Sequence, residues 1–436
     1  MKIQELKEII LTQREEIEEK IKKERIILRG IDFSRLKNYL SHPNILTILG
    51  VRRCGKSVLS LQILRENKNF LYINFDDERL IDFSVRDFDS LLEAYYELYG
   101  ESDYFILDEP HNISGWELFV NRLRRTKKIV ITGSNSRLLS GELATHLTGR
   151  YIDFVLFPFS LKEFLKLKDF YFTENDFYSP KKRAMIKRLV EEYIGSGGFP
   201  ERYHFGREIL VRIYSDIIEK DILKRYKIKN KRTFKEMVRY MISNYGCEIS
   251  FNKLKNVLGI KDIHTIKNWF SFLESAYLIF ILERFSFKLK NQMIAPKKVY
   301  CIDMGLANTV SFKTQEDRGK VIENLVAIEL FRRKSYINKD LEIYYWKDYM
   351  QNEIDFIIKE KENVMQLIQV CYDISDYRTK EREVKGLLKG SRELRCDDLL
   401  VITLDYDGEE IFDFDNLKRK IKFVSLWRWL LIRGTY

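Results

Sequence analysis

The stretch ILTILGVRRCGKSVLSLQIL, residues 45–64, decides the fold of this chain, because it joins a strand, a glycine-containing loop and a helix in one run. Its centre, GVRRCGKS at residues 50–57, fits the pattern G-x-x-x-x-G-K-[ST] at every defined position. The glycines let the backbone wrap closely around phosphate oxygens, so that successive N–H groups point inward. The helix that follows offers its N-terminus to the same phosphates. The alternative is a chance glycine-rich turn. The stretch predicts an α/β domain that binds a nucleoside triphosphate.

The residues of this loop have separate predicted roles. Lys56 would reach the β- and γ-phosphates of ATP, and the Ser57 hydroxyl would ligate Mg²⁺. The backbone of the other positions would cradle the phosphates. The predicted cofactor-binding set is Gly50, Val51, Arg52, Arg53, Cys54, Gly55, Lys56, Ser57 and Val58.

A second nucleotide signal follows at the end of another apolar run. Residues 104–107 lead directly into Asp108 and Glu109. A buried strand would hold Asp108 at its carboxyl end, where the carboxylate steadies the Mg²⁺ shell, and Glu109 would polarise a water for in-line attack on the γ-phosphate. Any buried strand that ends in acidic residues fits this pattern of four apolar residues followed by Asp-Glu. The pattern indicates a nucleotide site here because a complete phosphate loop precedes it. We expect Lys56 and Glu109 to act in catalysis, with Ser57 and Asp108 on the metal.

Two further candidates lie beyond the next predicted strand, residues 128–132. This strand runs into Gly133-Ser134-Asn135, where Ser134 or Asn135 would feel the γ-phosphate or the attacking water; the alternative is a plain polar turn. Arg150 would either stabilise transition-state charge or bond a carboxylate, and its spacing does not choose between the two. We take Asn135 and Arg150 as candidate catalytic residues.

The composition excludes several classes of protein. Of the 436 residues, 45% are hydrophobic and 32% are charged, which is ordinary for a chain that buries several cores. No apolar run approaches the roughly 18 to 20 residues that span a bilayer, and the N-terminus is too charged for a signal peptide. The five cysteines form no C-x-x-C pair and the five histidines no metal-binding motif, which argues against structural zinc and disulfides. We expect a cytoplasmic protein without a membrane partner.

The chain resembles the archaeal-type ATPases of the AAA+/STAND superfamily of P-loop proteins. The resemblance is carried, in order, by GVRRCGKS (50–57), FLYINFDDERL (70–80), FILDEPHNISGWE (105–117), ITGSNSRLLSGELATHLTGRYIDFVLFPFSLKEF (131–164), GSGGFPE (195–201) and DILKRYKI (221–228). It implies an AAA-type ATPase module with a helical lid, a winged helix and a C-terminal domain of restriction-endonuclease-like fold. Family members usually carry Gln two residues after Asp-Glu, and here that position is His111.

The implied fold class is α/β, a P-loop parallel-sheet ATPase domain followed by smaller domains. The predicted bounds are an N-terminal helical segment at 1–40, the ATPase core at 41–165, the lid at 166–231, the winged helix at 232–290 and an α+β domain like that of PD-(D/E)-x-K nucleases at 291–436. The glycine-rich break at 195–200 is either a hinge beside the lid or a plain turn.

The positive charge of the chain is concentrated in one region. Residues 221–298 hold 17 Lys and Arg against 6 Asp and Glu, an excess equal to the +11 of the whole chain. A basic block indicates nucleic acid, and the alternative is a lysine-rich solvated surface. The block coincides with the implied winged helix, which would either touch base edges with the start of its second helix or serve only intramolecular packing. The candidate DNA contacts are Lys253, Lys255, Lys261, His264, Thr265, Lys267, Asn268 and Lys288.

The C-terminal domain carries only part of a nuclease pattern. Glu323 lies on a predicted helix, Asp355 opens a predicted strand, and the next strand has Gln369 and Cys371 where such nucleases have E-x-K. Metal-dependent cleavage requires a second carboxylate and a basic lysine, and neither Gln369 nor Cys371 supplies that charge. We therefore expect a vestigial site that has lost the nuclease chemistry, in which Glu323 and Asp355 bind a metal or pair with Lys and Arg.

Together these patterns predict a Mg²⁺-dependent ATPase that acts as a nucleotide-driven switch and contacts DNA through its winged helix, with a protein partner and oligomerisation left open. One alternative is an ATP-dependent DNA-processing nuclease that uses Glu323 and Asp355. Another is a nucleotide-binding signalling or interaction protein without DNA. The uncharged Gln369 and Cys371 argue against the nuclease, and the intact Asp108-Glu109 pair argues against a nucleotide held only for structure.

Overall fold

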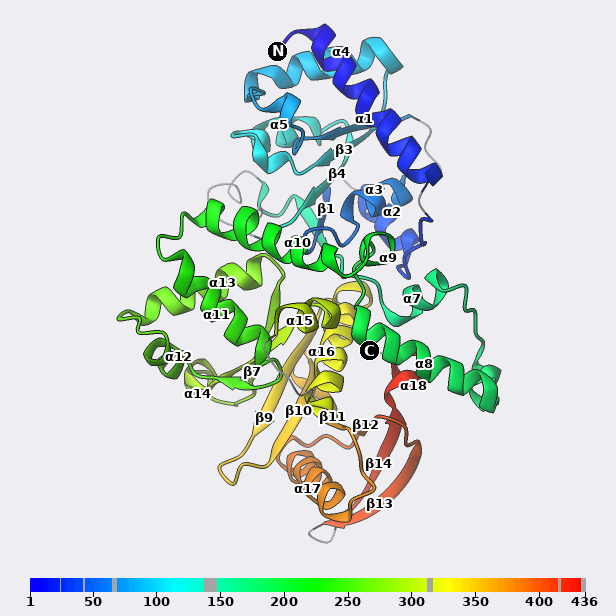
Figure 1. Ribbon diagram of the computed structural model, residues 1–436, viewed down its shortest axis with the longest axis vertical. Helices are drawn as coiled ribbons and strands as arrows, with labels where there is room; N and C mark the ends of the chain where they lie inside the picture. The colour runs from blue at the N-terminus through cyan, green and yellow to red at the C-terminus, as the bar shows by residue number, and fades with distance from the viewer. Residues whose placement is uncertain are drawn as a thin grey trace. The chain divides into compact units, whose positions relative to one another are not determined.

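The computed structural model describes residues 1–23, 25–41, 44–64, 69–136, 147–311, 317–414 and 417–432. The chain divides into two compact units, which we describe separately (Figure 1). Unit 1 is Met1–Phe157 with Ser275–Tyr277, and unit 2 is Pro158–Glu274 with Leu278–Tyr436. Residues 137–146, part of the stretch 131–164 that carries the family resemblance, lie outside the described residues.

Unit 1 is built on a parallel sheet of five strands in the order β2-β3-β4-β1-β5. The strands are β1 (Ile45–Leu49), β2 (Leu71–Asn74), β3 (Tyr104–Asp108), β4 (Lys128–Gly133) and β5 (Tyr151–Val155). β1 is buried along its whole length, as expected for a parallel strand covered on both faces. All five strands run the same way, so their carboxyl ends share one edge of the sheet. The predicted α/β fold class with a parallel P-loop sheet is confirmed.

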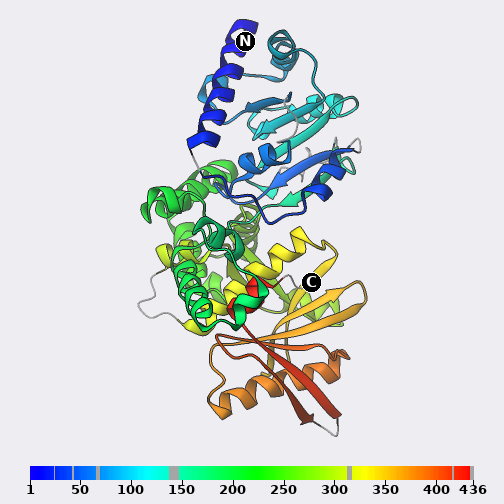
Figure 2. The same ribbon diagram turned by 90° about the vertical axis from the view of Figure 1, so that its right-hand side faces the viewer.

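Helices and short turns complete unit 1. They are α1 (Ile3–Lys23), α2 (Phe33–Ser41), α3 (Lys56–Ile63), α4 (Phe88–Tyr99) and α5 (Trp116–Leu123), with 3-10 turns at Glu78–Leu80, Val85–Asp87 and Pro110–Asn112. Leu6, Ile9 and Ile10 of α1 are buried in the same apolar core as β2 and α4. Figure 2 shows α1 running along one flank of unit 1. The predicted N-terminal helix therefore packs on the nucleotide-type sheet.

Unit 2 begins with helices and ends with a mixed sheet. Its helical elements are α7 (Leu161–Leu167), α8 (Pro180–Ser196), α9 (Arg202–Phe205), α10 (Glu208–Asp216), the π-helix Ile217–Lys224, α11 (Lys231–Ser243), α12 (Phe251–Val257), α13 (Ile263–Ser275), α14 (Leu289–Ile294), α15 (Met304–Val310), α16 (Arg318–Tyr336), α17 (Tyr377–Leu394) and α18 (Leu426–Leu431), with a 3-10 turn at Glu174–Tyr178.

The glycine-rich break after α8 is a packed junction. Gly197 has a left-handed backbone (φ 75°), and a side chain there would overlap the carboxylate of Asp303. The Gly198 N–H donates to Asp303 Oδ2 at 2.6 Å. Burial raises the pKa of Asp303 to about 6, against the backbone hydrogen bonds from Gly198 and Leu306 that lower it. Glycine is needed here because the chain passes directly over a buried carboxylate.

The segment from α11 to β8 has four helices, α11 to α14, and three short strands. The strands β6 (Glu248–Ile249) and β7 (Ile279–Arg284) both pair antiparallel with β8 (Lys297–Cys301). The helix α12 ends before Gly259, which has φ 65° as a helix-ending glycine requires. The elements run in the order α11-β6-α12-α13-β7-α14-β8, and the predicted domain boundary at residue 290 falls within α14, between the paired strands β7 and β8.

The same sheet continues into the C-terminal part of unit 2. Its nine strands have the order β13-β14-β12-β11-β10-β9-β7-β8-β6, with β9 (Leu341–Lys347), β10 (Glu353–Glu360), β11 (Asn363–Cys371), β12 (Leu399–Thr403), β13 (Gly408–Phe414) and β14 (Leu417–Ser425). The join between β7 and β9 is short, because only Glu283 and Arg284 pair with β9. α17 packs on β10 and β11 through Val384 and Leu387 (Figure 2).

Candidate functional site

The phosphate-type loop lies between β1 and α3 at the carboxyl edge of the unit 1 sheet. Gly50 has φ 147°, and a side chain there would overlap the carbonyl oxygen of Leu156. Gly55 has φ 101° and stands immediately before α3. The pattern needs glycine at these two positions because one passes against a neighbouring backbone and both have backbone angles that favour glycine.

The Lys56 side chain folds back onto the loop and contacts the main chain of its first two residues. Its side chain is 6% exposed, and Nζ donates to the carbonyl oxygens of Gly50 at 3.2 Å and Val51 at 3.1 Å. Glu109 Oε1 lies 3.9 Å from the same nitrogen. The ammonium therefore rests on neutral acceptors of its own loop, with one carboxylate at a longer distance.

The other loop residues support this conformation. The Cys54 thiol is buried and donates to the Leu156 carbonyl at 3.4 Å, and burial raises its pKa. Arg29 donates to the carbonyl oxygens of Cys54 and Phe157. Arg52 lies 3.6 Å from Asp76 in an ion pair. Val51 is buried, and Arg53, Ser57 and Val58 are half-buried.

Asp108 ends β3 beside the loop, and two hydroxyl groups hold it. Thr132 of β4 donates to Oδ1, and Tyr72 of β2 donates to Oδ2 at 2.7 Å. Tyr72 is also within hydrogen-bonding reach of Ser57. Burial, and then the charge of Asp108, raise the pKa of Tyr72 well above its ordinary value. Neither Tyr72 nor Thr132 was predicted, although both lie on strands adjacent to β3.

Glu109 has an unusual backbone conformation at the end of the same strand. Its φ of 50° is in the left-handed region, which non-glycine residues rarely adopt outside turns and functional sites. Oε2 accepts the Ser134 N–H at 3.3 Å and lies 3.2 Å from His111 Nδ1. His111, the departure from the family pattern, thus contacts the predicted general base.

The structure gathers most of the predicted nucleotide residues, but Arg150 is not among them. Ser134 and Asn135 are buried at the end of β4, on the edge that carries Asp108. Arg150 precedes β5, accepts the Ile45 N–H at the start of β1, and donates to Asn121 at 2.9 Å. It lies at the amino edge of the sheet, about 16 Å from the loop by the rise of a five-residue strand. Arg150 cannot touch phosphate in the site of its own chain.

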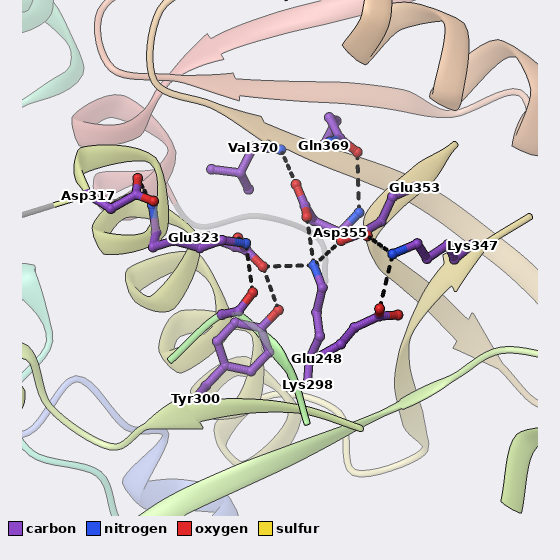
Figure 3. Close-up of polar contacts among 12 residues, drawn as sticks. Glu248, Lys298, Tyr300, Asp317, Glu323, Lys347, Glu353, Asp355, Gln369 and Val370 are labelled. Atoms are coloured by element: carbon purple, nitrogen blue, oxygen red, sulfur yellow. Dashed lines mark hydrogen bonds and ion pairs between the residues drawn. The ribbon is translucent and has the colours of Figure 1, made fainter. Parts of the chain in front are cut away.

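In unit 2 the structure brings Glu323 and Asp355 together around a lysine that the sequence reasoning missed. Lys298 Nζ of β8 lies 2.9 Å from Glu323 Oε1, 2.9 Å from Asp355 Oδ1 and 2.6 Å from Glu353 Oε1 (Figure 3). Its side chain is 1% exposed. We call Lys298, Glu323, Glu353 and Asp355 the Lys298 cluster. The sequence did contain a signal for this lysine, because Lys298 lies in the strand KKVYC, which is buried along its whole length. A buried ammonium requires carboxylate partners.

A second layer of polar groups surrounds this cluster. Lys320 pairs with Glu323 at 2.7 Å. Lys347 pairs with Glu353 at 3.2 Å and with Glu248 at 3.0 Å (Figure 3). The Tyr300 hydroxyl donates to Glu323 at 2.8 Å. These contacts come from β6, β8, β9, β10 and α16, so the network ties together elements far apart in the sequence.

The charges of the cluster shift one another's pKa. Burial by itself would lower the pKa of Lys298, but Asp355 and Glu323 raise it well above the ordinary value. Burial raises the pKa of Asp355 to about 6, with repulsion from Glu323 and Glu353 adding to it and Lys298 opposing it. Burial would raise the pKa of Glu323, but the positive charges of Lys298 and Lys320 outweigh it and lower that pKa. Of the three carboxylates, Asp355 is therefore the one that resists ionisation.

The two remaining nuclease-pattern positions do not join the cluster as charges. Gln369 accepts the Asp355 N–H at 3.2 Å and donates to Glu383 at 2.6 Å. Cys371 donates to the Asp373 carbonyl at 3.2 Å, and burial raises its pKa to about 11. The ammonium and the further carboxylate beside Glu323 and Asp355 come from Lys298 of β8 and Glu353 of β10, which were not predicted. Of the two roles expected for Glu323 and Asp355, the structure has the pairing with lysine.

The candidate DNA contacts lie on one segment and are mostly exposed. Trp269, Phe270 and Ile266 of α13 face the core, which leaves His264, Lys267 and Asn268 on the solvent side. Lys253, Lys261 and Lys288 are exposed as well, whereas Lys255 and Thr265 are half-buried. Asp262 accepts the N–H groups of His264 and Thr265 at the start of α13, so an acid stands beside the predicted reading residues.

Among the described residues, no helix combines the length and the apolar character that crossing a bilayer would require.

Comparisons with known proteins give the family. The AAA domain family matches residues 42–165, and two domains of unknown function match residues 187–317 and 318–428. The chain is 35% identical over 426 residues to the uncharacterized protein MJ1544 of Methanocaldococcus jannaschii, which covers 94% of this chain and 92% of that protein. It is 31% identical over 350 residues to an uncharacterized protein of Haemophilus influenzae, covering 76% of this chain and 83% of the relative.

Solved structures with distant similarity include a Walker-type ATPase of Pyrococcus abyssi. That structure has 16% identity and a TM-score of 0.42, covering 66% of this chain and 98% of its own. DnaA of Aquifex aeolicus bound to AMPPCP has 17% identity and a TM-score of 0.25, covering 55% of this chain and 85% of its own.

Proposed function

Because the chain belongs to the same family as these Methanocaldococcus and Haemophilus proteins, and its residues 42–165 are an AAA domain with a P-loop, we propose that it is a Mg²⁺-dependent ATPase that acts as a nucleotide-driven switch. One observation carries the proposal. Lys56 and Glu109 lie 3.9 Å apart at the carboxyl edge of the parallel sheet, with Asp108 beside them on β3. This is the set of charges that phosphoryl transfer to water requires.

The donors at this edge fit Mg²⁺. Ser57 and Asp108 offer a hydroxyl and a carboxylate oxygen, the hard ligands that Mg²⁺ prefers, and Tyr72 contacts both. When bound, the ion would neutralise charge on the phosphates. The chain's own contribution is to hold Asp108 in one orientation, since Thr132 and Tyr72 each occupy one of its oxygens.

Glu109 is the proposed general base. The left-handed backbone turns its carboxylate towards Lys56, and the Ser134 N–H fixes one oxygen. In that orientation a water placed for in-line attack would give its proton to Glu109 while Lys56 stabilises charge on the γ-phosphate. The buried Asn135 is the proposed sensor of that phosphate.

Glu109→Gln tests the assignment of the base. The amide keeps the shape but cannot take a proton, so we expect ATP to bind normally and turnover to fall by about 10²-fold or more. Binding is measured with a fluorescent ATP analogue and turnover by phosphate release. Normal turnover in the purified variant would contradict the role of Glu109, and loss of binding would contradict the proposed geometry.

We also propose that the switch contacts duplex DNA through a winged helix formed by α11 to β8. Its support is the basic segment 221–298 and the solvent-facing side of α13. Reversing Lys255, Lys261 and Lys267 to Glu should weaken binding and reduce the dependence of log K on log salt by about 1 per lost phosphate contact. The matched control reverses Lys20, Lys22 and Lys23, three exposed lysines of α1. If the two triple variants weaken DNA binding equally, binding would depend only on the overall positive charge of the chain and not on the proposed winged helix.

ATP turnover with and without DNA separates the remaining alternatives. Stimulation by DNA supports a DNA-linked switch with the lid at 166–231 coupling the two events. A chain that hydrolyses ATP and does not bind DNA would be a signalling switch with a protein partner. Its size with and without nucleotide, measured by light scattering, tells whether the switch controls oligomerisation.

A further inference from the structure

We propose that the Lys298 ammonium is the built-in cation of the Lys298 cluster, which therefore binds no divalent metal and instead fixes β8 to α16 and β10. The proposal concerns unit 2 alone and does not depend on the proposed ATPase function.

The ammonium is fully used by the cluster. A lysine has three N–H donors, and Nζ of Lys298 has three carboxylate partners within 2.9 Å. Its side chain is 1% exposed, so no donor is left for a molecule arriving from solvent. A lysine that assists phosphodiester cleavage has to face the substrate, and this one faces only its own chain.

The carboxylates are also occupied on their other oxygens. Lys320 contacts Glu323 Oε2 at 2.7 Å, Lys347 contacts Glu353 Oε2 at 3.2 Å, and the Val370 N–H donates to Asp355 Oδ2 at 3.0 Å. A divalent ion would have to displace Lys298 and share oxygens already bound to these donors. Within the ranges that the structure describes, no group of three or more His, Cys, Asp or Glu side chains is arranged to hold a metal.

The cluster has a mechanical consequence. β9 and β7 stand between β10 and β8 in the sheet order, which in a flat sheet would separate β10 from β8 by about 14 Å. Lys298 nevertheless touches Asp355, so the sheet turns sharply where β7 and β9 share only two paired residues. Lys298 of β8 contacts Glu353 and Asp355 of β10 across this part of the sheet (Figure 3). It therefore holds the α11-to-β8 segment to the C-terminal strands as one body.

Two variants of Lys298 separate a cation site from a plain ion pair. Lys298→Met removes the charge and keeps the volume, whereas Lys298→Ala removes the charge and leaves room for an ion. Both are made in full-length, nucleotide-free protein that also carries Asp108→Asn, which removes a proposed Mg²⁺ ligand of the ATP site. The thermal midpoint is measured in EDTA and in excess MnCl₂, and bound Mn²⁺ is counted by electron paramagnetic resonance.

We expect the parent to bind no Mn²⁺ in unit 2 and to have the same Tm in both buffers. Both Lys298 variants should lose on the order of 10 °C in Tm, because the buried Glu323 and Asp355 and the half-buried Glu353 then lose the cation that they share. Mn²⁺ should restore part of that loss in Lys298→Ala and none in Lys298→Met. If Lys298→Ala does not fold, the same comparison is made with Glu353→Gln added, which removes one negative charge from the cluster.

Three results would overturn the proposal. The first is a rise in parent Tm with Mn²⁺ that Asp355→Asn abolishes, since the cluster would then take metal as it stands. The second is Mn²⁺-dependent cleavage of plasmid DNA by the wild type that Asp355→Ala abolishes. The third is a folded Lys298→Ala that Mn²⁺ leaves unchanged, because Lys298 would then be an ordinary ion-pair partner and not the occupant of a cation site.

Discussion

Each unit buries a lysine beside carboxylates, Lys56 in unit 1 and Lys298 in unit 2, and the partners of these two lysines differ. Lys56 rests on two main-chain carbonyl oxygens at 3.2 and 3.1 Å, with Glu109 at 3.9 Å. Lys298 touches three carboxylates at 2.6 to 2.9 Å. A lysine held by neutral acceptors can transfer to phosphate oxygens at little cost, whereas one held by charged partners leaves uncompensated buried charge when it moves. The same residue type thus serves an exchangeable site in one unit and a fixed one in the other.

Removing the charge of Lys56 should have the largest effect on chemistry. Lys56→Met loses the contact to the β- and γ-phosphates, and we expect ATP turnover to fall by about 10²- to 10³-fold. Only neutral carbonyl oxygens lose a close donor, so the free energy of unfolding should fall by about 1–3 kcal/mol, less than the loss of a shared cation costs. Phosphate release and urea unfolding of the same preparation check both halves. A large loss of stability would erase the contrast between the two lysines.

Lys298→Met should show the opposite pattern. We expect the free energy of unfolding to fall by about 3–5 kcal/mol, because the buried carboxylates of Glu323 and Asp355 and the half-buried one of Glu353 lose the cation that they share. The affinity of the folded protein for ATP should be unchanged, since Lys298 lies in the other unit. Urea unfolding gives the first quantity and titration with a fluorescent ATP analogue the second. Weaker ATP binding by folded Lys298→Met would show that the Lys298 cluster and the ATP site are coupled.

Tyr72→Phe should weaken Mg²⁺ binding in unit 1 by about 10-fold through the orientation of Asp108. The variant removes one hydroxyl that contacts Asp108 at 2.7 Å and leaves the strand intact. The readout is the Mg²⁺ concentration that supports half-maximal binding of a fluorescent ATP analogue. Tyr104→Phe is the matched control, because that hydroxyl contacts Lys128 at the opposite end of β3. A Tyr72→Phe profile equal to the control would remove Tyr72 from the site.

Asp355→Asn should change the pH dependence of stability, the smallest of these effects. The pKa of Asp355 is raised to about 6 in the folded protein from an ordinary value of 3.8. Between these values the folded state holds a proton that the unfolded state has lost, so this group's contribution to stability falls as the pH rises from about 4 to 6. The free energy of unfolding, measured with urea, should change less between about pH 4 and 6 for Asp355→Asn than for the wild type. An identical slope would show that Asp355 ionises at its ordinary pKa.

The nucleotide site was largely readable in advance because its residues follow one another along the chain. The loop from Gly50 to Ser57 is contiguous, and Asp108 and Glu109 follow an apolar strand that must enter the same parallel sheet. Arg150 lies outside the site because it comes directly before β5, at the amino edge of the sheet. That position follows from the pairing of β5 with β1, which joins residues about 100 positions apart in the sequence.

By itself the sequence determined the α/β class, the phosphate loop and the acid pair, since local spacing imposes a strand, a glycine turn and a helix start. Only the tertiary structure decided the rest. Tyr72 and Thr132 reach Asp108 because strand order places β2 and β4 on either side of β3. Lys298 and Glu353 complete the cluster around Glu323 and Asp355 because the sheet turns between β7 and β9. A buried charge is balanced by whatever the fold brings within a few ångströms, and spacing along the chain does not record that distance.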